Sequence, residues 1–521
     1  MRQSKLGSRR LAGLAPHLLV ALAAVSSLSS ATPLLAQSES VAVGDLSVPL
    51  SRQRQHEGLL MVDYQQINVP GIEDIDLLGT HAMLRVNDWA YLGLGGYFPL
   101  AQGEYGGFMA LGGIVHAQTN ITDRIFVNAG LSFGGGGGGL SIAQSRQLSG
   151  TGGYLRTYAG LGYQFDGYAL GLTYSSMEFK DSLIDDDQLS IFFQKDFGYR
   201  TGSYDKQNTG LSFLPASELQ GHGAMLSFGL DNYHQINPQG SYKGDIHAAD
   251  LQYSNFGPRG GYWYVAAAAG YEGLPLYNQF IAGAGKRFAL SERVNLYAQV
   301  GAGSGGYAPS LIETGSGLLV YPKVSAEYRL NNTTGVALTA GYLMSVDGSS
   351  RNATVGIALN RHFGNPAAEN RRGNIISGRF KGYRFSVANE TVTDVSYLDV
   401  KRDDFNMMTL QLDKSLGDHF YMPGRIAIAY EDYRSYPGNG EISLGLGVQS
   451  RYLSGDRMQF FGEVQLGANV EGPIVRPAVG VELAVNENVA LRASVAQAYG
   501  RDYEASSISL GLTSRFSLLE F

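Results

Sequence analysis

Three segments of this chain share one alternating pattern, and that pattern limits them to a single kind of secondary structure. Each segment follows an arginine, at Arg124, Arg293 and Arg457. The first, third, fifth, seventh and ninth residues after each arginine are apolar or small. Because successive side chains of a β-strand point to opposite faces, each segment is predicted to be a strand with one apolar and one polar face. The residues between the apolar positions supply the polar groups, which are Asn128, Ser132, Asn295, Gln299, Gln459, Glu463 and Gln465.

The pattern recurs at intervals far longer than the roughly 20–50 residues of solenoid repeats. We therefore predict a duplicated unit of many strands, in three modules at residues 58–199, 222–364 and 376–521. Alternation predicts about eight strands in each module. In the second module these strands are expected at 223–236, 246–256, 261–272, 277–289, 293–305, 318–330, 335–346 and 352–363.

The connections between the predicted strands alternate in length. Short turns such as Asn87-Asp88 and Asp166-Gly167 follow even-numbered strands, and longer connections such as 134–152 and 303–317 follow odd-numbered ones. Membrane β-barrels have short periplasmic turns and longer external loops. A soluble sandwich has no reason to sort its turns in this way. Strands of about ten residues also suit a tilted crossing of a bilayer.

The N-terminus has the features of a secretory signal peptide, which we predict at residues 1–36. Arg9 and Arg10 belong to a positively charged start, and 18–28 is an apolar run. The alternative is a transmembrane anchor, but the run is shorter than the roughly 20 residues that a spanning helix needs. Residues 37–57 are then expected to be a short periplasmic leader.

Composition excludes several classes of function. The chain has no cysteine, so it has neither disulfides nor cysteine metal sites. Charged residues make up 16% of the chain, below the roughly 25% of ordinary soluble domains. A net charge of −7 over 521 residues is mild and gives no reason to expect a nucleic-acid partner.

The last residues of the chain alternate up to a terminal aromatic side chain, from Ile508 to Phe521. This ending resembles the closing strand of bacterial outer-membrane β-barrel proteins, a broad porin-like class. In that class the final aromatic residue, here Phe521, is part of the signal read by the barrel-assembly machinery. The resemblance covers nearly the whole mature chain. It implies export to the outer membrane of a Gram-negative bacterium, with outer-membrane lipid and the assembly machinery as partners.

The fold class predicted from these features is an all-β, transmembrane antiparallel β-barrel. Our main expectation is one barrel of about 24 strands built from the three eight-stranded modules, since one chain rarely carries several membrane barrels. The alternative is three tandem eight-stranded barrels, favoured by the long seams between modules. Eight strands leave an interior that side chains fill, whereas sixteen or more leave a channel.

The odd or even position of a residue along its strand, its parity, also predicts which face of the barrel its side chain occupies. A membrane barrel turns apolar side chains toward lipid and polar ones toward its lumen. Parity predicts seven lumen-facing residues: Arg156, Gln299, Lys323, Glu327, Glu463, Arg476 and Glu482. They are expected either to set the selectivity of a channel or to form ion pairs that fill a narrow barrel.

No enzyme signature or cofactor motif is present. The nine histidines are scattered, and neither Gly-x-Ser-x-Gly nor His-Glu-x-x-His occurs. The glycine run 134–139 lacks the Lys-Ser/Thr of a phosphate-binding loop and is expected to be a flexible exit from a strand. Asp185, Asp186 and Asp187 are expected in a solvated external loop rather than at a divalent cation.

Three functions are compatible with the sequence. The first is an outer-membrane channel for polar solutes or for an exported polymer, such as a polysaccharide or a polypeptide. The second is a non-conducting structural or anchoring protein that presents surface loops to a periplasmic partner, a surface partner or an extracellular matrix. The third is a soluble exported β-protein.

Overall fold

The computed structural model describes residues 53–138, 145–207, 210–215, 223–275, 277–307, 310–331, 333–363, 375–431, 439–453 and 457–520. The predicted signal peptide, most of the leader and Phe521 therefore lie outside the described residues. Strands account for most of the described chain, and every strand pairing is antiparallel.

The first eight strands form a closed ring, because β1 pairs with both β2 and β8. We call this ring the first barrel. A short helix, α2 (Ser145–Ser149), lies in the connection between the fifth and sixth strands. The strands are β1 (Gln53–Ile67), β2 (Ile75–Arg85), β3 (Ala90–Pro99), β4 (Met109–Asn120), β5 (Ile125–Gly137), β6 (Gly153–Phe165), β7 (Tyr168–Phe179) and β8 (Asp185–Gly202).

The second barrel is a separate closed ring in which β10 pairs with β17. The strands are β10 (Ala224–Gln235), β11 (Ile246–Phe256), β12 (Gly261–Glu272), β13 (Asn278–Ala289), β14 (Val294–Gly306), β15 (Leu318–Arg329), β16 (Thr334–Ser345) and β17 (Arg351–Phe363). A 3-10 turn, η4 (Pro258–Gly260), joins β11 to β12. The strand ends differ from the predicted ones by at most one residue.

The third barrel is closed by the pairing of β18 with both β20 and β26. Its strands are β18 (Ile375–Tyr397), β20 (Phe405–Ser415), β21 (Phe420–Ala429), β22 (Gly440–Gln449), β23 (Met458–Asn469), β24 (Gly472–Ala484), β25 (Val489–Gly500) and β26 (Tyr503–Glu520). A two-residue strand, β19 (Val400–Lys401), pairs with the end of β18. The short strand β9 (Gly210–Pro215) pairs with the start of β18, and Gly202 of β8 pairs with Ser517 of β26.

The expectation of a single barrel of about 24 strands is wrong. Alternation along a strand does not say which strand closes a ring, and here the first and last strands of each set of eight pair with each other. The alternative of three tandem eight-stranded barrels matches this pairing. That the barrels are copies of one ancestral module stays a prediction.

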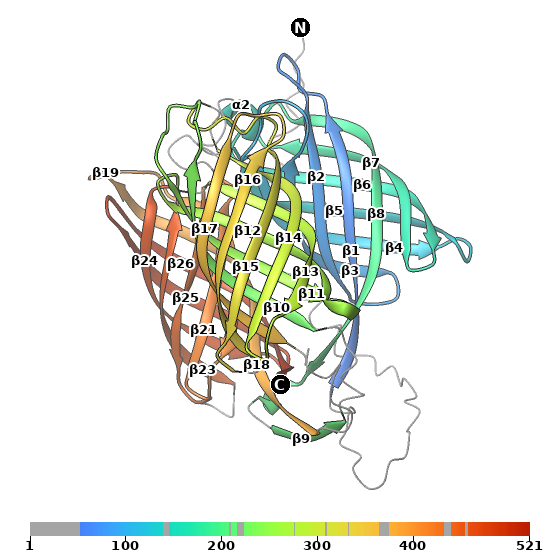
Figure 1. Cartoon of the computed structure of the whole chain (residues 1–521), viewed down its shortest axis with the longest axis vertical. Helices are drawn as coiled ribbons and strands as arrows, with labels where there is room; N and C mark the ends of the chain where they lie inside the picture. Colours follow the sequence, from blue (N-terminus) through green and yellow to red (C-terminus); the bar gives the residue numbers. More distant parts are fainter. Residues whose placement is uncertain are drawn as a thin grey trace.

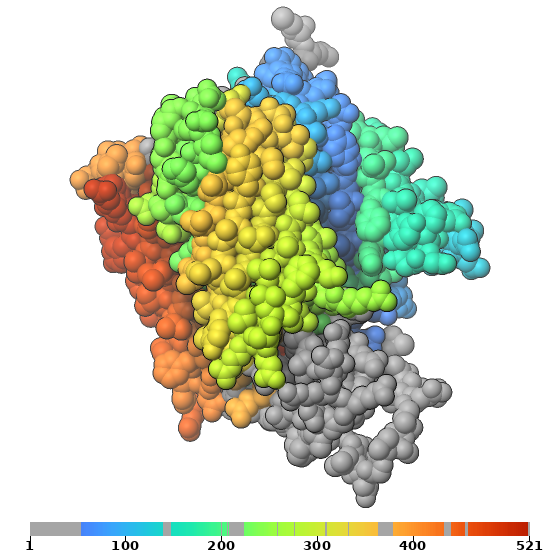
Figure 2. All heavy atoms as spheres, in the orientation of Figure 1, coloured from blue at the N-terminus to red at the C-terminus, as the bar shows by residue number. Residues whose placement is uncertain are grey.

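The three barrels lie side by side, with the second barrel in front of the other two in Figures 1 and 2. The first and second barrels meet where the Phe98 ring stacks on Phe280, with centroids 5.0 Å apart. Nearby, Asn278 Nδ2 donates to the Gly107 carbonyl over 3.0 Å. The first and third barrels meet where β5 passes β21 so closely that a Cβ on Gly135 would overlap the Ala429 carbonyl. β12 packs against β23 and β24, which completes the triangle.

The contact at Gly135 corrects the prediction for the glycine run. Residues 134–137 continue β5 rather than leaving it as a flexible exit. Glycine is needed there because another barrel's backbone occupies the space of a side chain. Residues 185–187 likewise begin β8 rather than sitting in a loop, and Tyr174 donates a hydrogen bond to Asp187.

The outer and inner faces of the strands differ in the way that parity predicts. Leu338 and Leu446 point outward and are 68% and 66% exposed, whereas Asn128 and Gln465 point inward and are buried. No helix in the described segments is long and apolar enough to cross a membrane. The architecture is that of porin-like outer-membrane proteins: closed antiparallel barrels with apolar outer faces and polar interiors.

Candidate functional site

All seven residues predicted to face a lumen lie inside the barrels, and each has partners there. Arg156 is in the first barrel, Gln299, Lys323 and Glu327 are in the second, and Glu463, Arg476 and Glu482 are in the third. Whether they govern the passage of any solute remains a prediction.

The first barrel holds a buried ionic cluster around Asp63. Arg156 Nη2 lies 3.1 Å from Asp63 Oδ2, and His81 Nε2 lies 2.8 Å from Asp63 Oδ1. Gln65 Nε2 donates to the same carboxylate over 2.6 Å. The guanidinium of Arg156 also lies over the Tyr158 ring, 4.7 Å from its centroid. Sequence reasoning missed Asp63 and His81, although both occupy inward positions of strands that alternate.

The second barrel holds two clusters at different heights. Lys323 Nζ lies 2.9 Å from Asp231 Oδ2 and 3.8 Å from Asp250 Oδ1. Glu327 accepts hydrogen bonds from Tyr297 over 2.8 Å and from Asn295 over 2.9 Å, and pairs with His362 over 2.6 Å. Gln299 pairs side chain to side chain with Gln252.

The third barrel is the most highly charged, and its groups form adjoining networks of ion pairs. Glu390 joins Arg476 and Arg425 at 2.9 and 2.7 Å, and Arg425 reaches Glu441 at 2.6 Å. Further ion pairs link Arg492 to Asp413 and Glu463, and link Glu482 to Arg384 and Arg515. A gap of about 20 Å³ remains beside Glu390 and the arginines, the space of about one water molecule.

The ends of the barrels that carry the longer connections, which we call the loop ends, are closed by apolar side chains. In the first barrel three side chains pack among inward residues of the strands: Tyr105 and Phe108, which precede β4, and Leu148, which belongs to α2. Tyr277 and Ile312 are among the residues that do so in the second barrel, and Val395 and Phe405 among those in the third. Each described interior is thus an apolar layer above a polar network.

The opposite ends, which we call the short-turn ends, differ between barrels. The third barrel is covered there by the 3-10 turn η2 (Tyr204–Lys206), which follows the last strand of the first barrel. Tyr204 is 5% exposed, and Arg515 lies over its ring at 5.5 Å. Arg515 Nη1 also donates to the Tyr452 hydroxyl over 2.8 Å. Burial raises the pKa of the Tyr204 hydroxyl, so this side chain is neutral where it covers the barrel.

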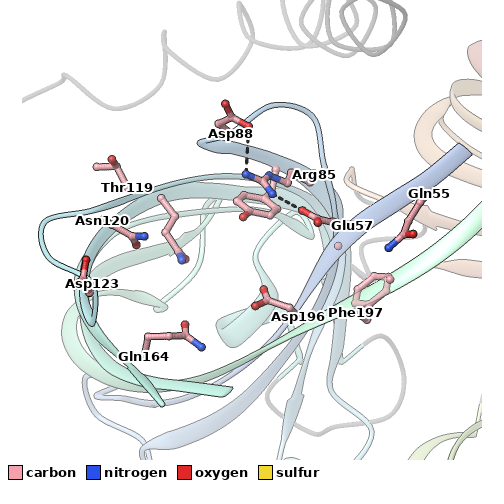
Figure 3. A pocket seen from close by; sticks show the side chains of 14 residues that line it. Gln55, Glu57, Arg85, Asp88, Thr119, Asn120, Asp123, Gln164, Asp196 and Phe197 are labelled. Atoms are coloured by element: carbon pink, nitrogen blue, oxygen red, sulfur yellow. Dashed lines mark hydrogen bonds and ion pairs between the residues drawn. The ribbon is translucent and has the colours of Figure 1, made fainter. Parts of the chain in front are cut away.

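The short-turn end of the first barrel is open and forms a cavity of about 800 Å³, which we call the cup (Figure 3). Arg85 extends across its rim and pairs with Glu57 and with Asp88. Sequence reasoning missed the cup, because its members come from the ends of different strands. Its lining consists of Gln55, Glu57, Gly58, Arg85, Asp88, Tyr91, Gln118, Thr119, Asn120, Asp123, Gln164, Asp196, Phe197 and Gly198.

Comparison with known proteins gives no family for this chain. No protein-family model matches it, and no curated protein matches it. Among solved structures it is similar to the KdgM porin in complex with disordered oligogalacturonate, at 9% identity over 55% of this chain and 98% of that one, with a TM-score of 0.15. It is also similar to OpdQ of Pseudomonas aeruginosa, at 9% identity over 90% and 99% of the two chains, with a TM-score of 0.21.

A third similar structure is a mutant of the ferric enterobactin receptor PfeA of Pseudomonas aeruginosa, at 10% identity over 88% and 81% of the two chains, with a TM-score of 0.28. TM-scores this low carry no argument about the fold or the function of this chain.

The chemistry available inside the barrels is limited. Among the described residues no group of three or more His, Asp or Glu side chains could hold a metal ion. The buried carboxylates and guanidinium groups bind each other. The cup presents charged groups to solvent around a cavity of ligand size.

Proposed function

We propose that this chain is an outer-membrane protein whose three barrels form a non-conducting membrane scaffold that presents its loops to a partner. The observation that carries the proposal is that ion-paired side chains and an apolar layer block each described interior, including the first barrel beyond its cup. An eight-stranded barrel is just wide enough for side chains to fill. The filled interiors favour this alternative over the channel.

The apolar outer faces support the membrane assignment. Large side chains such as Leu189, Leu338 and Val479 are at least 60% exposed on the outside of the strands. A soluble protein rarely exposes apolar patches larger than a few hundred Å². Insertion by the barrel-assembly machinery, and a surface or periplasmic partner, belong to the same proposal.

Conductance in planar lipid bilayers tests it. The full chain, folded in detergent and shown to be folded by heat-modifiable migration on gels, is expected to give no stepwise current. A sixteen-stranded porin in the same bilayers is the positive control, because barrels of that size leave an aqueous channel. Reproducible current steps from the folded chain would overturn the scaffold.

A second candidate is a channel through the first barrel that conducts only when the layers closing the barrel beyond the cup rearrange. The cup already opens one end of that barrel and lines it with polar groups. A channel entered through the cup would change its ion selectivity on the substitution Asp196→Lys. A shift in reversal potential with this variant would establish the channel and displace the scaffold.

A further inference from the structure

The cup is a blind cavity. Its inner side is a buried apolar cluster that includes Leu59, Met83, Phe126 and Phe192, and Tyr91 of the lining packs against this cluster. Beyond the cluster lie the Asp63 network and the apolar layer of the loop end. A molecule that enters the cup therefore has no way onward. A volume of about 800 Å³ lies within the roughly 300–1,000 Å³ of small-molecule sites.

The charges of the cup are strongly unequal. Four carboxylates, from Glu57, Asp88, Asp123 and Asp196, face one guanidinium, that of Arg85. Arg85 already pairs with Glu57 and with Asp88. Among the described residues Asp123 and Asp196 make no ion pair and no hydrogen bond through their carboxylates. The cavity therefore keeps an excess of negative charge that a cationic ligand can neutralise.

The positions of the carboxylates decide between kinds of cation. They come from β1, from the turn before β3, from the turn before β5 and from β8, so they stand around the mouth (Figure 3). No group of three such side chains is close enough to hold a metal ion in the described chain. Separated carboxylates match a ligand whose own positive charges are separated.

Two buried amides lie in the barrel interior beneath the rim, outside the lining of the cup. Asn128 is 4% exposed and lies opposite Gln118 of the cup in the β4–β5 pairing, yet neither its Nδ2 nor its Oδ1 has a hydrogen-bond partner. Gln194 is 2% exposed, lies on the inward face of β8 two residues before Asp196, and leaves its Oε1 unpaired. Unpaired buried polar atoms are costly and call for a partner. These atoms are enclosed, so the amides that a ligand in the cup meets are those of Gln118 and Gln164 in its lining, whose oxygens can accept hydrogen bonds from an ammonium group.

We propose that the cup binds a small organic polycation with separated ammonium groups, of the linear polyamine class. Asp123 and Asp196 pair with its ammonium groups, the amides of Gln118 and Gln164 accept hydrogen bonds from it, and the Tyr91 ring contacts its methylene chain. The site does not rest on the scaffold function, because binding requires only that the first barrel is folded and its mouth accessible.

Calorimetric titration of the full chain in detergent with spermidine, a linear trication, tests the proposal. We expect saturable binding, and a dissociation constant about tenfold higher in the variant Asp123→Asn/Asp196→Asn, because each lost pair weakens binding a few-fold. The control is Glu292→Gln, which removes a carboxylate from the equivalent turn of the second barrel and is expected to leave the dissociation constant unchanged. Heat-modifiable migration on gels confirms that each variant is folded, and the two single variants replace the double one if it does not fold.

Competing ligands separate the proposed site from general ionic attraction. Magnesium chloride at the same ionic strength and a monoamine are expected to displace spermidine weakly. Equal displacement by magnesium, an equal loss of affinity in Glu292→Gln, or tighter binding of a neutral oligosaccharide would each overturn the proposal. None of these outcomes depends on conductance, so failure of the polyamine site and failure of the scaffold are distinguishable.

Discussion

Buried charges inside the barrels are matched to their partners residue by residue. The third barrel contains five arginines and five carboxylates in adjoining networks of ion pairs. The second barrel places a single lysine, Lys323, between Asp231 and Asp250. Removing one member of such a buried set leaves the others uncompensated, which costs more stability than the intact set contributes.

The substitution Lys323→Met tests this at one residue. It leaves Asp231 and Asp250 buried without their cation, and we expect it to lower the free energy of unfolding by about 3–5 kcal/mol. Denaturant unfolding in lipid vesicles measures the change. Lys286→Met, on an exposed position of β13, is the matched control and is expected to change stability by less than about 0.5 kcal/mol.

A compensating variant makes this test stricter. A triple variant combines Lys323→Met with Asp231→Asn and Asp250→Asn, so that no unpaired carboxylate remains buried. Much of the stability lost in Lys323→Met is expected to return in this variant. If Lys323→Met alone lowers the free energy of unfolding by less than about 1 kcal/mol, Lys323 and its two aspartates are not desolvated, since exposed ion pairs contribute no more than that.

Alternation explains why the amino-acid sequence suffices to assign single positions to a face. It predicts that Lys323 and Glu327 face inward because they share one parity along a strand whose other face is apolar. Their partners Asp231, Asp250 and His362 could not be assigned to them, because pairing across a barrel depends on ring size and on the tilt of its strands.

Short elements help to close two of the barrel ends, the loop end of the first barrel and the short-turn end of the third. α2 places Leu148 in the loop end of the first barrel, and η2 places Tyr204 in the short-turn end of the third. Neither element could be predicted from alternation. Each is a few residues long, and each acts through one side chain inserted into a mouth that the sequence does not reveal.

Tyr204→Ala is expected to uncover the short-turn end of the third barrel. Loss of the ring removes the cover over Arg515, so amide hydrogen exchange in the last residues of β26 should quicken at least about tenfold, as for local opening. Mass spectrometry of peptides from 510–520 measures it. Tyr168→Ala removes an outward-facing ring of the first barrel and should leave these amides unchanged. Unaltered exchange in Tyr204→Ala would mean that η2 does not seal the barrel.

At the scale of the whole molecule, glycine rather than a large apolar surface sets how closely the barrels approach. A Cβ on Gly135 would overlap the Ala429 carbonyl, and one on Gly106 would lie 2.7 Å from Thr314 Oγ1 and 3.0 Å from the Gly305 carbonyl. Both contacts lie at the loop ends. A glycine-rich strand has the same sequence pattern whether it faces lipid or another barrel. The sequence therefore offered both one ring and three, and it could not decide between them or give the arrangement of the rings.

Gly135→Val is expected to separate the first and third barrels without unfolding either. The valine methyl groups have no space beside the β21 backbone, so the two loop ends must part. Electron microscopy of the protein in detergent should show a wider angle between these barrels. Gly462→Val is the control, since a Cβ there meets nothing closer than 3.8 Å. If the arrangement of the three barrels is unchanged in Gly135→Val, the contact between β5 and β21 tolerates a side chain.

The hydrogen bond from Ser517 Oγ to the Ser203 carbonyl, 2.9 Å long, joins residues 314 positions apart. The acceptor, Ser203, is synthesised early, and the donor, Ser517, is among the last residues to be synthesised. This bond therefore forms only after almost the whole chain has been made. Contacts so distant in sequence form slowly, because the loop between them must close first. The docking of 203–207 onto the third barrel is therefore the natural last event of assembly, and a chain stalled before β26 would leave that segment without a place to bind.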